Sequence, residues 1–194
     1  MQYVWLAIAW VLFGLVHSVF AASKIKQWAK KVMQSRYAYY RLIYSSLATI
    51  ALALVLYYYF SVPQQLLWAN SLAEKAIAVA IFIPAVVIMA VTIKKYFMDL
   101  SGIDVLLKRT PAPAHLVQTG LHKYMRHPLY SGTLLFVWSI FLWQPSLTNL
   151  ISCICITLYT RIGIYFEERK LVNEFGDEYM QYAKKTPMLV PGIR

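Results

Sequence analysis

Residues 120–143, GLHKYMRHPLYSGTLLFVWSIFLW, place ionisable side chains directly before a long apolar run. Arg126 and His127 precede Pro128, and no charged residue follows until the run ends. Proline fits the first turn of a helix, because its missing N–H costs nothing there. The stretch therefore predicts a membrane helix that begins near residue 128, with Arg126 and His127 at or just inside the membrane surface. Ionisable groups at such a depth are costly and usually face a protein interior or a cavity.

The composition is that of a protein embedded in a bilayer. Of the 194 residues, 60% are hydrophobic and 14% are charged, whereas soluble domains average about 45–50% apolar and about 25% charged residues. The net charge of +11 comes from basic residues that lie in blocks between apolar runs. This arrangement favours contact with anionic lipid headgroups. Because no base-stacking or helix-turn-helix pattern accompanies the charge, we expect no binding to nucleic acid.

The apolar runs predict an all-α, polytopic membrane protein with five transmembrane helices, since a span needs about 20 apolar residues. The five runs are residues 3–22, 42–60, 76–97, 129–143 and 147–166. We interpret the first as a retained span, because it lacks the basic start and small-residue exit of a cleaved signal. The last two are separated by Gln144, Pro145 and Ser146, so we expect them to form a tight helical hairpin. The fourth run is shorter than a bilayer is thick.

The loops alternate between basic and nearly uncharged. Residues 23–41 and 94–127 each carry six basic residues, whereas the hairpin turn carries no charge. Because basic loops stay in the cytoplasm, we expect the N-terminus outside and the C-terminus in the cytoplasm. We divide the chain into residues 1–100, which form three N-terminal transmembrane helices, and residues 101–194. The second part is a cofactor-binding catalytic core that contains a cytoplasmic loop, the hairpin and an amphipathic tail with a break at Phe175-Gly176.

Polar residues at the cytoplasmic ends of the last two spans are the candidates for chemistry. Unpaired N–H groups at a helix start form an anion site, with Arg126 as a counter-ion; alternatively, Arg126 extends to lipid phosphate. Arg161 and Glu168 are two helical turns apart, so both can project from one face and hold a substrate. Alternatively, Glu167 and Glu168 pair with basic neighbours at an ordinary helix end.

The histidines do not predict a metal site. His17 lies inside the first span, where a hydrogen bond to a neighbouring helix is the expected role. His115, His122 and His127 are spaced by seven and then five residues, which matches no common ligand pattern, so we expect no metal. The long loop before them contains Thr110-Pro-Ala-Pro113, a stiff extended piece.

Two motifs resemble those of a known family. The first is residues 116–132, LVQTGLHKYMRHPLYSG, and the second is Glu167-Glu168 followed by Leu171, Phe175-Gly176, Glu178-Tyr179, Tyr182 and a late proline. In order and spacing they resemble the core of the integral membrane methyltransferases, which include the isoprenylcysteine carboxyl methyltransferases and the phospholipid N-methyltransferases. The small size is similar to the compact prokaryotic branch, which implies an inner or plasma membrane protein whose active site faces the cytoplasm.

The resemblance implies an enzyme that uses S-adenosylmethionine to methylate oxygen, sulfur or nitrogen. Its acceptor is implied to be a lipophilic small molecule, or a prenyl- or lipid-linked one, that enters from the bilayer. Catalytic roles are expected for Arg126, Arg161, Glu167 and Glu168. The residues implied to hold the cofactor are His115, Leu116, Val117, Gly120, Leu121, His122, His127, Pro128, Tyr130 and Glu168. The family commonly has tyrosine where this chain has His122, and its isoprenylcysteine enzymes have an arginine slightly closer to the glutamates than Arg161.

Two other functions fit part of the pattern. A sterol-reductase-like membrane enzyme would use NADPH, with Lys108-Arg109 near the 2′-phosphate. A non-catalytic membrane accessory protein would bind neither cofactor. Bound cofactor therefore distinguishes the three functions, whereas the acceptor and the oligomeric state do not follow from the sequence.

Overall fold

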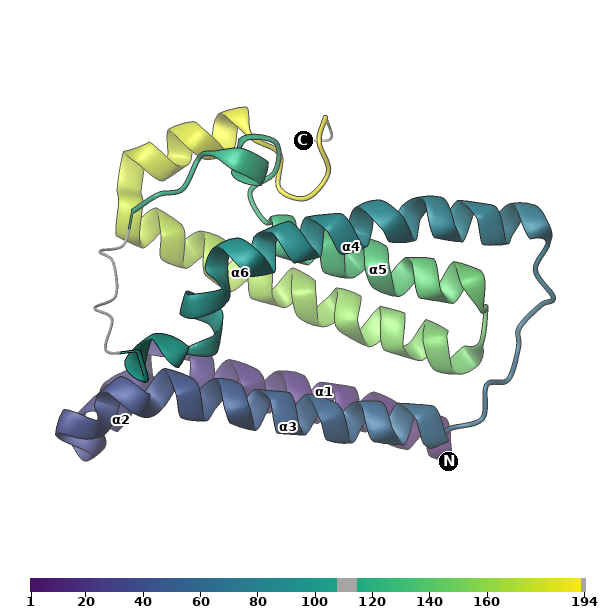
Figure 1. Cartoon of the computed structure of the whole chain (residues 1–194), viewed down its shortest axis with the longest axis horizontal. Helices are drawn as coiled ribbons and strands as arrows, with labels where there is room; N and C mark the ends of the chain where they lie inside the picture. The colour runs from purple at the N-terminus through teal and green to yellow at the C-terminus, as the bar shows by residue number, and fades with distance from the viewer. Residues whose placement is uncertain (108–114, 193–194) are drawn as a thin grey trace. The chain divides into compact units, whose positions relative to one another are not determined.

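The computed structural model describes residues 1–107 and 115–192, in which helices are joined by short irregular connections (Figure 1). No β-strand occurs in these ranges beyond one isolated bridge between Leu66 and Ser146, so the all-α prediction is confirmed. The α-helices are α1 (Gln2–Ala21), α2 (Ser23–Met33), α3 (Tyr40–Ser61), α4 (Leu72–Ser101), α5 (Pro128–Trp143) and α6 (Leu147–Lys185). Short 3-10 helices are η1 (Gln34–Tyr39), η2 (Ile103–Val105) and η3 (Gly120–Lys123).

Four of the predicted spans are confirmed as helices long and apolar enough to cross a membrane. They lie in α1, α3, α4 and α6 of the described chain. Helix α5 has 16 residues, which is about 24 Å at 1.5 Å per residue, whereas the hydrocarbon core of a bilayer is about 30 Å thick. A fifth crossing by α5 and the orientation of the chain therefore stay predictions.

The described residues pack into two units. The first consists of Met1–Pro63 with the described part of Tyr96–Ala112, and the second of Gln64–Lys95 with the described part of Pro113–Arg194. These packing units do not follow the expected division at residue 100, because most of α4 packs with the C-terminal helices. The functional division into residues 1–100 and 101–194 stays a prediction.

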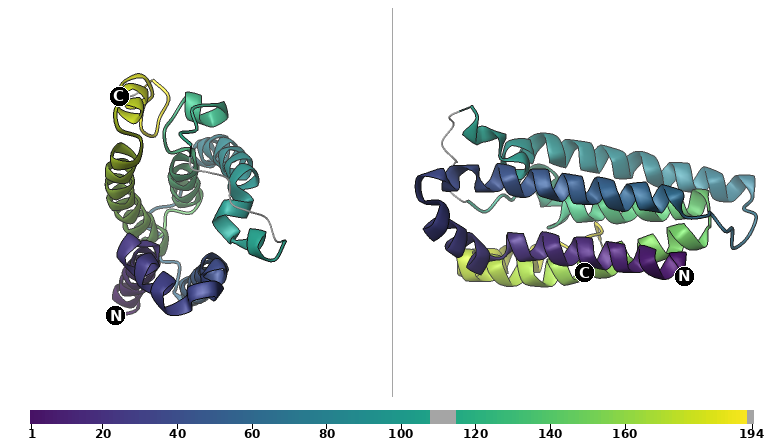
Figure 2. Two further views of the ribbon diagram at one scale, coloured as in Figure 1. Left: turned by 90° about the vertical axis from the view of Figure 1, so that its left-hand side faces the viewer. Right: turned by 90° about the horizontal axis from the view of Figure 1, so that it is seen from below.

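In the first unit, tyrosines join the antiparallel helices α1 and α3. The Tyr58 hydroxyl donates to the Gln2 carbonyl at 3.2 Å, and the Tyr44 hydroxyl lies 2.8 Å from Nε2 of His17. The expected hydrogen bond between His17 and a neighbouring helix is therefore confirmed. Helix α2 crosses from the end of α1 to the start of α3 (Figure 2).

In the second unit, α5 and α6 form the predicted hairpin. Trp138 Nε1 donates to Thr157 Oγ1 across the pair at 3.1 Å. Ser146 is fully buried in the turn and caps α6, because its hydroxyl accepts the Asn149 N–H at 3.2 Å. Ser, with a side-chain oxygen that satisfies one of the free N–H groups of the first turn, is a favoured residue at such a position.

The predicted break in the C-terminal helix is confirmed at Gly176. This residue has φ 54° and ψ −129°, a backbone conformation that glycine adopts without the steric cost of a Cβ. In a straight helix Glu168 and Tyr179 would lie about 16 Å apart along the axis. The break turns the end of α6 back toward η3 and the start of α5 (Figure 1), so that Tyr179 reaches Glu168.

Candidate functional site

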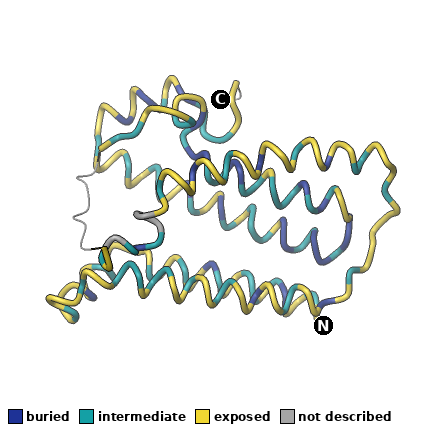
Figure 3. Tube along the Cα trace, viewed as in Figure 1, coloured by how far each residue is buried: buried dark blue, intermediate teal, exposed yellow. Residues whose placement is uncertain are grey.

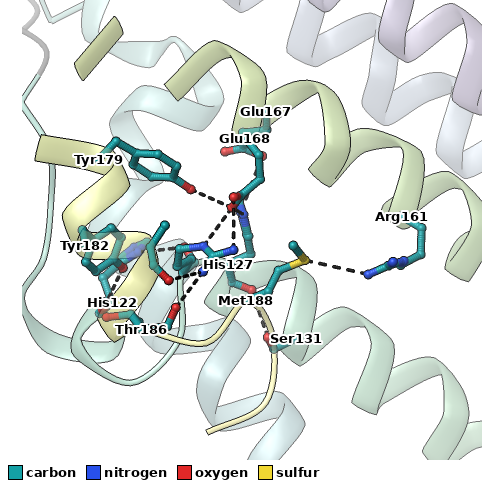
Figure 4. A network of polar contacts seen from close by, with 12 residues as sticks. His122, His127, Ser131, Arg161, Glu167, Glu168, Tyr179, Tyr182, Thr186 and Met188 are labelled. Atoms are coloured by element: carbon teal, nitrogen blue, oxygen red, sulfur yellow. Dashed lines mark hydrogen bonds and ion pairs between the residues drawn. The ribbon is translucent and has the colours of Figure 1, made fainter. Parts of the chain in front are cut away.

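Glu168 is the centre of a hydrogen-bond network in the second unit (Figure 4). Its Oε1 accepts from Nε of Arg126 at 2.9 Å and from the Tyr179 hydroxyl at 2.6 Å, and lies 2.6 Å from Nε2 of His127. Its Oε2 accepts from Nη2 of Arg126 at 3.1 Å. The guanidinium and the carboxylate therefore form a two-pronged ion pair, the strongest and most directional kind.

This environment keeps the Glu168 carboxylate charged. Burial alone would raise the pKa of Glu168, but the hydrogen bonds from His127, Arg126 and Tyr179 outweigh burial and bring it down to about 2. The same contact acts in the opposite direction on Tyr179, whose pKa is raised by burial and by its bond to the carboxylate. Tyr179 therefore remains a donor and Glu168 an acceptor throughout the neutral pH range.

Arg126 also joins the entry of α5 to the end of α6. Its Nη1 donates to the carbonyls of Ala183 at 3.0 Å and Thr186 at 2.7 Å. Its backbone N–H donates to the Pro187 carbonyl at 2.9 Å. The Arg126 side chain is 10% exposed, so its charge is directed into the protein. Arg126 thus joins Glu168, the end of α6 and the residues that follow it.

A second tyrosine fixes η3 to the same part of α6. The Tyr182 hydroxyl, on a residue that is 6% exposed, donates to the His122 carbonyl at 2.6 Å. Nδ1 of His122 lies 3.1 Å from the Arg126 carbonyl, and burial lowers the pKa of this imidazole. Tyr182 thus binds η3 directly, whereas Tyr179 acts through Glu168, which contacts Arg126 and His127 just before α5.

Glu167 differs from Glu168 in having an open carboxylate. Its side chain is 42% exposed, and its Oε2 lies 3.9 Å from Nδ1 of His127. The buried imidazole of His127 therefore lies between two carboxylates. The ring of Tyr130 lies beside that imidazole, with the centroids 5.6 Å apart. Glu167, His127 and Tyr130 form a group in which acidic and aromatic surfaces meet, and we call it the Glu167 group.

Arg161 lies apart from this network (Figure 4). The residue is exposed, and its Nη1 contacts Sδ of Met188 at 3.8 Å. That Arg161 and Glu168 hold one substrate together stays a prediction.

The other residues predicted to hold a cofactor lie along the segment that leads to α5. His115 and Gly120 are exposed, Leu116, Val117 and Leu121 are half-buried, and Pro128 is buried. A cavity of about 310 Å³ opens beside this segment. It is lined by Gln118, Lys123, Glu178, Gln181, Tyr182, Lys185 and Thr186, which were not among the predicted ligands. The segment Thr110-Pro-Ala-Pro113 and the pair Lys108-Arg109 lie outside the described residues.

The sequence interpretation missed the structural roles of Tyr179, Tyr182 and the carbonyls that follow them. Both tyrosines belong to the second motif, but the sequence alone assigns no function to either. A signal was nevertheless present, because residues three apart after a helix break share one face of the next helical segment. In the described ranges, no three His, Cys, Asp or Glu side chains lie close enough to hold a metal ion.

Comparison with known proteins identifies the family of this chain. The NnrU protein family matches residues 5–192. The chain belongs to the NnrU family. A methanethiol S-methyltransferase of Pseudomonas sp. (strain GM41(2012)) is 30% identical over 194 residues, which cover 95% of this chain and 72% of that protein. The corresponding enzyme of Pseudomonas deceptionensis is 27% identical, over 94% of this chain and 70% of the relative.

A second kind of relative matches a shorter part of this NnrU-family chain. The protein-S-isoprenylcysteine O-methyltransferase of Schizosaccharomyces pombe is 39% identical over 82 residues, 40% of this chain and 34% of that protein. No solved structure matches the chain. The relatives confirm the resemblance stated from the two motifs, and they identify the chain as a methyltransferase. With its four long apolar helices, it is a multi-pass membrane protein.

Proposed function

We propose that this chain transfers a methyl group from S-adenosylmethionine to the sulfur of a small lipophilic thiol. One observation carries the proposal: relatives named methanethiol S-methyltransferases match 94–95% of the chain. The isoprenylcysteine enzyme, in contrast, matches 40% of it. A small thiol is therefore favoured over a prenylated protein as the acceptor.

The Glu167 group suits a sulfonium cofactor. Glu167 offers an open negative charge next to the rings of His127 and Tyr130, and both carboxylates and aromatic faces attract cations. Glu168 cannot serve in the same way, because its oxygens already accept from Arg126 and Tyr179. We therefore assign cofactor contact to Glu167 and assign to Glu168 the positioning of His127.

The residues around this group have separable tasks. Leu116, Val117 and Leu121, all half-buried, exclude water from the segment before α5. When bound, S-adenosylmethionine supplies an electrophilic methyl group, which a thiolate sulfur takes while the methyl–sulfonium bond breaks. Because this transfer needs alignment more than acid–base help, the rigid anchoring of His127 and η3 is the main contribution of the chain.

The same proposal places the protein in a prokaryotic plasma membrane. The blocks of basic residues in residues 23–41 and 94–127 put these loops, and with them the Glu167 group, on the cytoplasmic side. The thiol then enters from the bilayer and the cofactor from the cytoplasm.

Calorimetric titration of the detergent-purified chain tests the cofactor. S-adenosylmethionine and S-adenosylhomocysteine are expected to bind with micromolar affinity, and NADPH is expected not to bind. Binding of NADPH alone would support a sterol-reductase-like enzyme. If none of the three compounds bound, a non-catalytic accessory protein would be supported. An assay with short alkyl thiols and a prenylcysteine then compares the acceptors, and faster methylation of the prenylcysteine would contradict the thiol assignment.

A matched pair of variants tests the roles of the two glutamates. Glu167→Gln is expected to weaken cofactor binding at least tenfold without lowering the melting temperature. Glu168→Gln is expected to lower the melting temperature, because Arg126 loses its charged partner in a site from which water is largely excluded. Equal cofactor affinity in Glu167→Gln and the unchanged chain would overturn the assignment of Glu167.

A further inference from the structure

Helix α2 is set off from the spans on either side by two breaks in the backbone. Ala22, before it, is extended at φ −65° and ψ 139°, and Gln34, after it, has φ 46°. A positive φ at a residue other than glycine is uncommon, so the second break is well defined. Because of these breaks, α2 continues neither α1 nor α3 but crosses between them at the end of the pair (Figure 2).

The sequence of α2 divides into an apolar and a basic face. At 100° per residue, five apolar residues fall on one arc of the helix: Ile25, Trp28, Ala29, Val32 and Met33. The opposite arc carries four lysines and no acidic residue: Lys24, Lys26, Lys30 and Lys31. The division is sharp for a helix of 11 residues.

The apolar face is only partly used inside the protein. Ala29 is 3% exposed, whereas Trp28 is 62% and Val32 60% exposed. Trp28 and Val32 are four residues apart and therefore adjacent on the helix surface. A tryptophan and an aliphatic residue exposed beside lysines are typical of helices that lie in the membrane interface, where the ring enters the headgroup region.

We propose that α2 lies in the plane of the membrane surface and binds anionic phospholipid. Its position at the end of two apolar spans brings it to the depth of the headgroups, and its lysines complement their charge. Trp28 and Val32 insert among the upper parts of the acyl chains, while Lys30 and Lys31, both exposed, contact phosphates. This function is independent of methyl transfer and anchors the unit that contains α1 and α3.

Fluorescence quenching in vesicles tests the proposal on the full chain. The protein is reconstituted into phosphatidylcholine vesicles with phosphatidylglycerol, and one lipid at a time carries bromine on its acyl chains. The signal of Trp28 is the difference between the chain and its Trp28→Phe variant. We expect both brominated lipids to quench Trp28, and phosphatidylglycerol to associate several-fold more strongly. A basic residue near an anionic surface contributes about fivefold in affinity, equivalent to about 1 kcal/mol.

A matched pair of double variants isolates the charge of α2. Lys30→Gln with Lys31→Gln is expected to abolish the preference for phosphatidylglycerol, whereas Lys170→Gln with Lys184→Gln, two exposed lysines of α6, preserves it. Absence of quenching by either lipid would show that α2 is covered by protein and would overturn the proposal. Equal quenching by the two lipids would also overturn it. If inorganic phosphate removed the preference more effectively than chloride of equal ionic strength, the site would be one for soluble anions instead.

Discussion

The helix pairs α1–α3 and α5–α6 are both apolar, but different interactions hold them together. The buried residues are Leu6 and Gly14 in α1 and Val55 in α3, compared with five in α5 and eight in α6 (Figure 3). Several of those in α5 and α6 are polar, including Ser139, Ser152 and Thr160. In a bilayer, apolar side chains gain little by leaving lipid, so small and polar residues carry helix association. The C-terminal pair is therefore built for precise packing, and the N-terminal pair for contact with lipid.

Substitution of Arg126 is expected to cause the largest loss of stability in the C-terminal helix pair. Arg126→Ala leaves the Glu168 carboxylate without its ion-pair partner and the end of α6 without two hydrogen bonds, which costs about 3–5 kcal/mol. Thermal unfolding of the purified chain, followed by near-UV circular dichroism, measures the loss. Arg126→Lys should recover part of it, because lysine cannot form the two-pronged pair. Arg169→Ala, at an exposed position, is the control, and an equal loss there would contradict the special role of Arg126.

Acid should weaken the C-terminal unit through Glu168. The pKa of this group is about 2 in the folded chain and ordinarily 4.5, so its folded pKa is depressed. Its contribution, on the order of 3 kcal/mol, is present above about pH 4.5 and is lost as the pH falls toward 2. Melting temperatures between pH 3 and 7 should therefore fall more steeply for the unchanged chain than for Glu168→Gln. Parallel curves would show that another group governs the acid response.

Alanine substitutions at two glycines of the C-terminal helices should have different effects on stability, both smaller than the loss expected at Arg126. A Cβ added to Gly132 would lie 2.7 Å from Cγ of Met89 and 3.2 Å from the Ala85 carbonyl. Gly132→Ala therefore forces α4 and α5 apart and should destabilise the chain by about 1–3 kcal/mol. At Gly163 the nearest atom is the Tyr130 hydroxyl at 3.9 Å, so Gly163→Ala should be neutral. Equal melting temperatures for the two variants would show that α4 is not closely packed on α5.

The smallest change in stability is expected for a substitution in the N-terminal helix pair. Leu54 of α3 is 65% exposed, so Leu54→Ala should change the unfolding free energy by about 0.5 kcal/mol or less. Ile164 of α6 is 1% exposed, and Ile164→Ala should cost about 2–5 kcal/mol. The difference between the melting temperatures of the two variants measures how much more the C-terminal pair depends on buried side chains than the N-terminal pair does. A large loss at Leu54 would indicate a protein partner on α3.

The sequence predicted those parts of the fold that depend on local chemistry. The lengths of the apolar runs predicted the helices. The short connection Gln144-Pro-Ser146 predicted the hairpin, and Gly176 predicted the break in the last helix. The arrangement of the site was less accessible, because it depends on contacts between distant residues. The charge of Arg126 could pair with lipid, ligand or protein equally well. It contacts Glu168 and backbone carbonyls because the end of α6 turns back toward it. Likewise, the sequence Glu167-Glu168 does not show which of the two carboxylates is buried. The position of Tyr179, which donates to Glu168, is needed to decide this.

The partners of Arg126 have a consequence for the way the protein is made. Its carbonyl acceptors in Ala183 and Thr186 lie 57 and 60 residues further along the chain. At about 5–20 residues per second of translation, the ribosome needs several seconds to supply them. During that interval Arg126 lacks the two carbonyl groups that later accept from its Nη1. The Nη1 group of Arg126 therefore gains both of its carbonyl partners only after the whole of α6 has been synthesised.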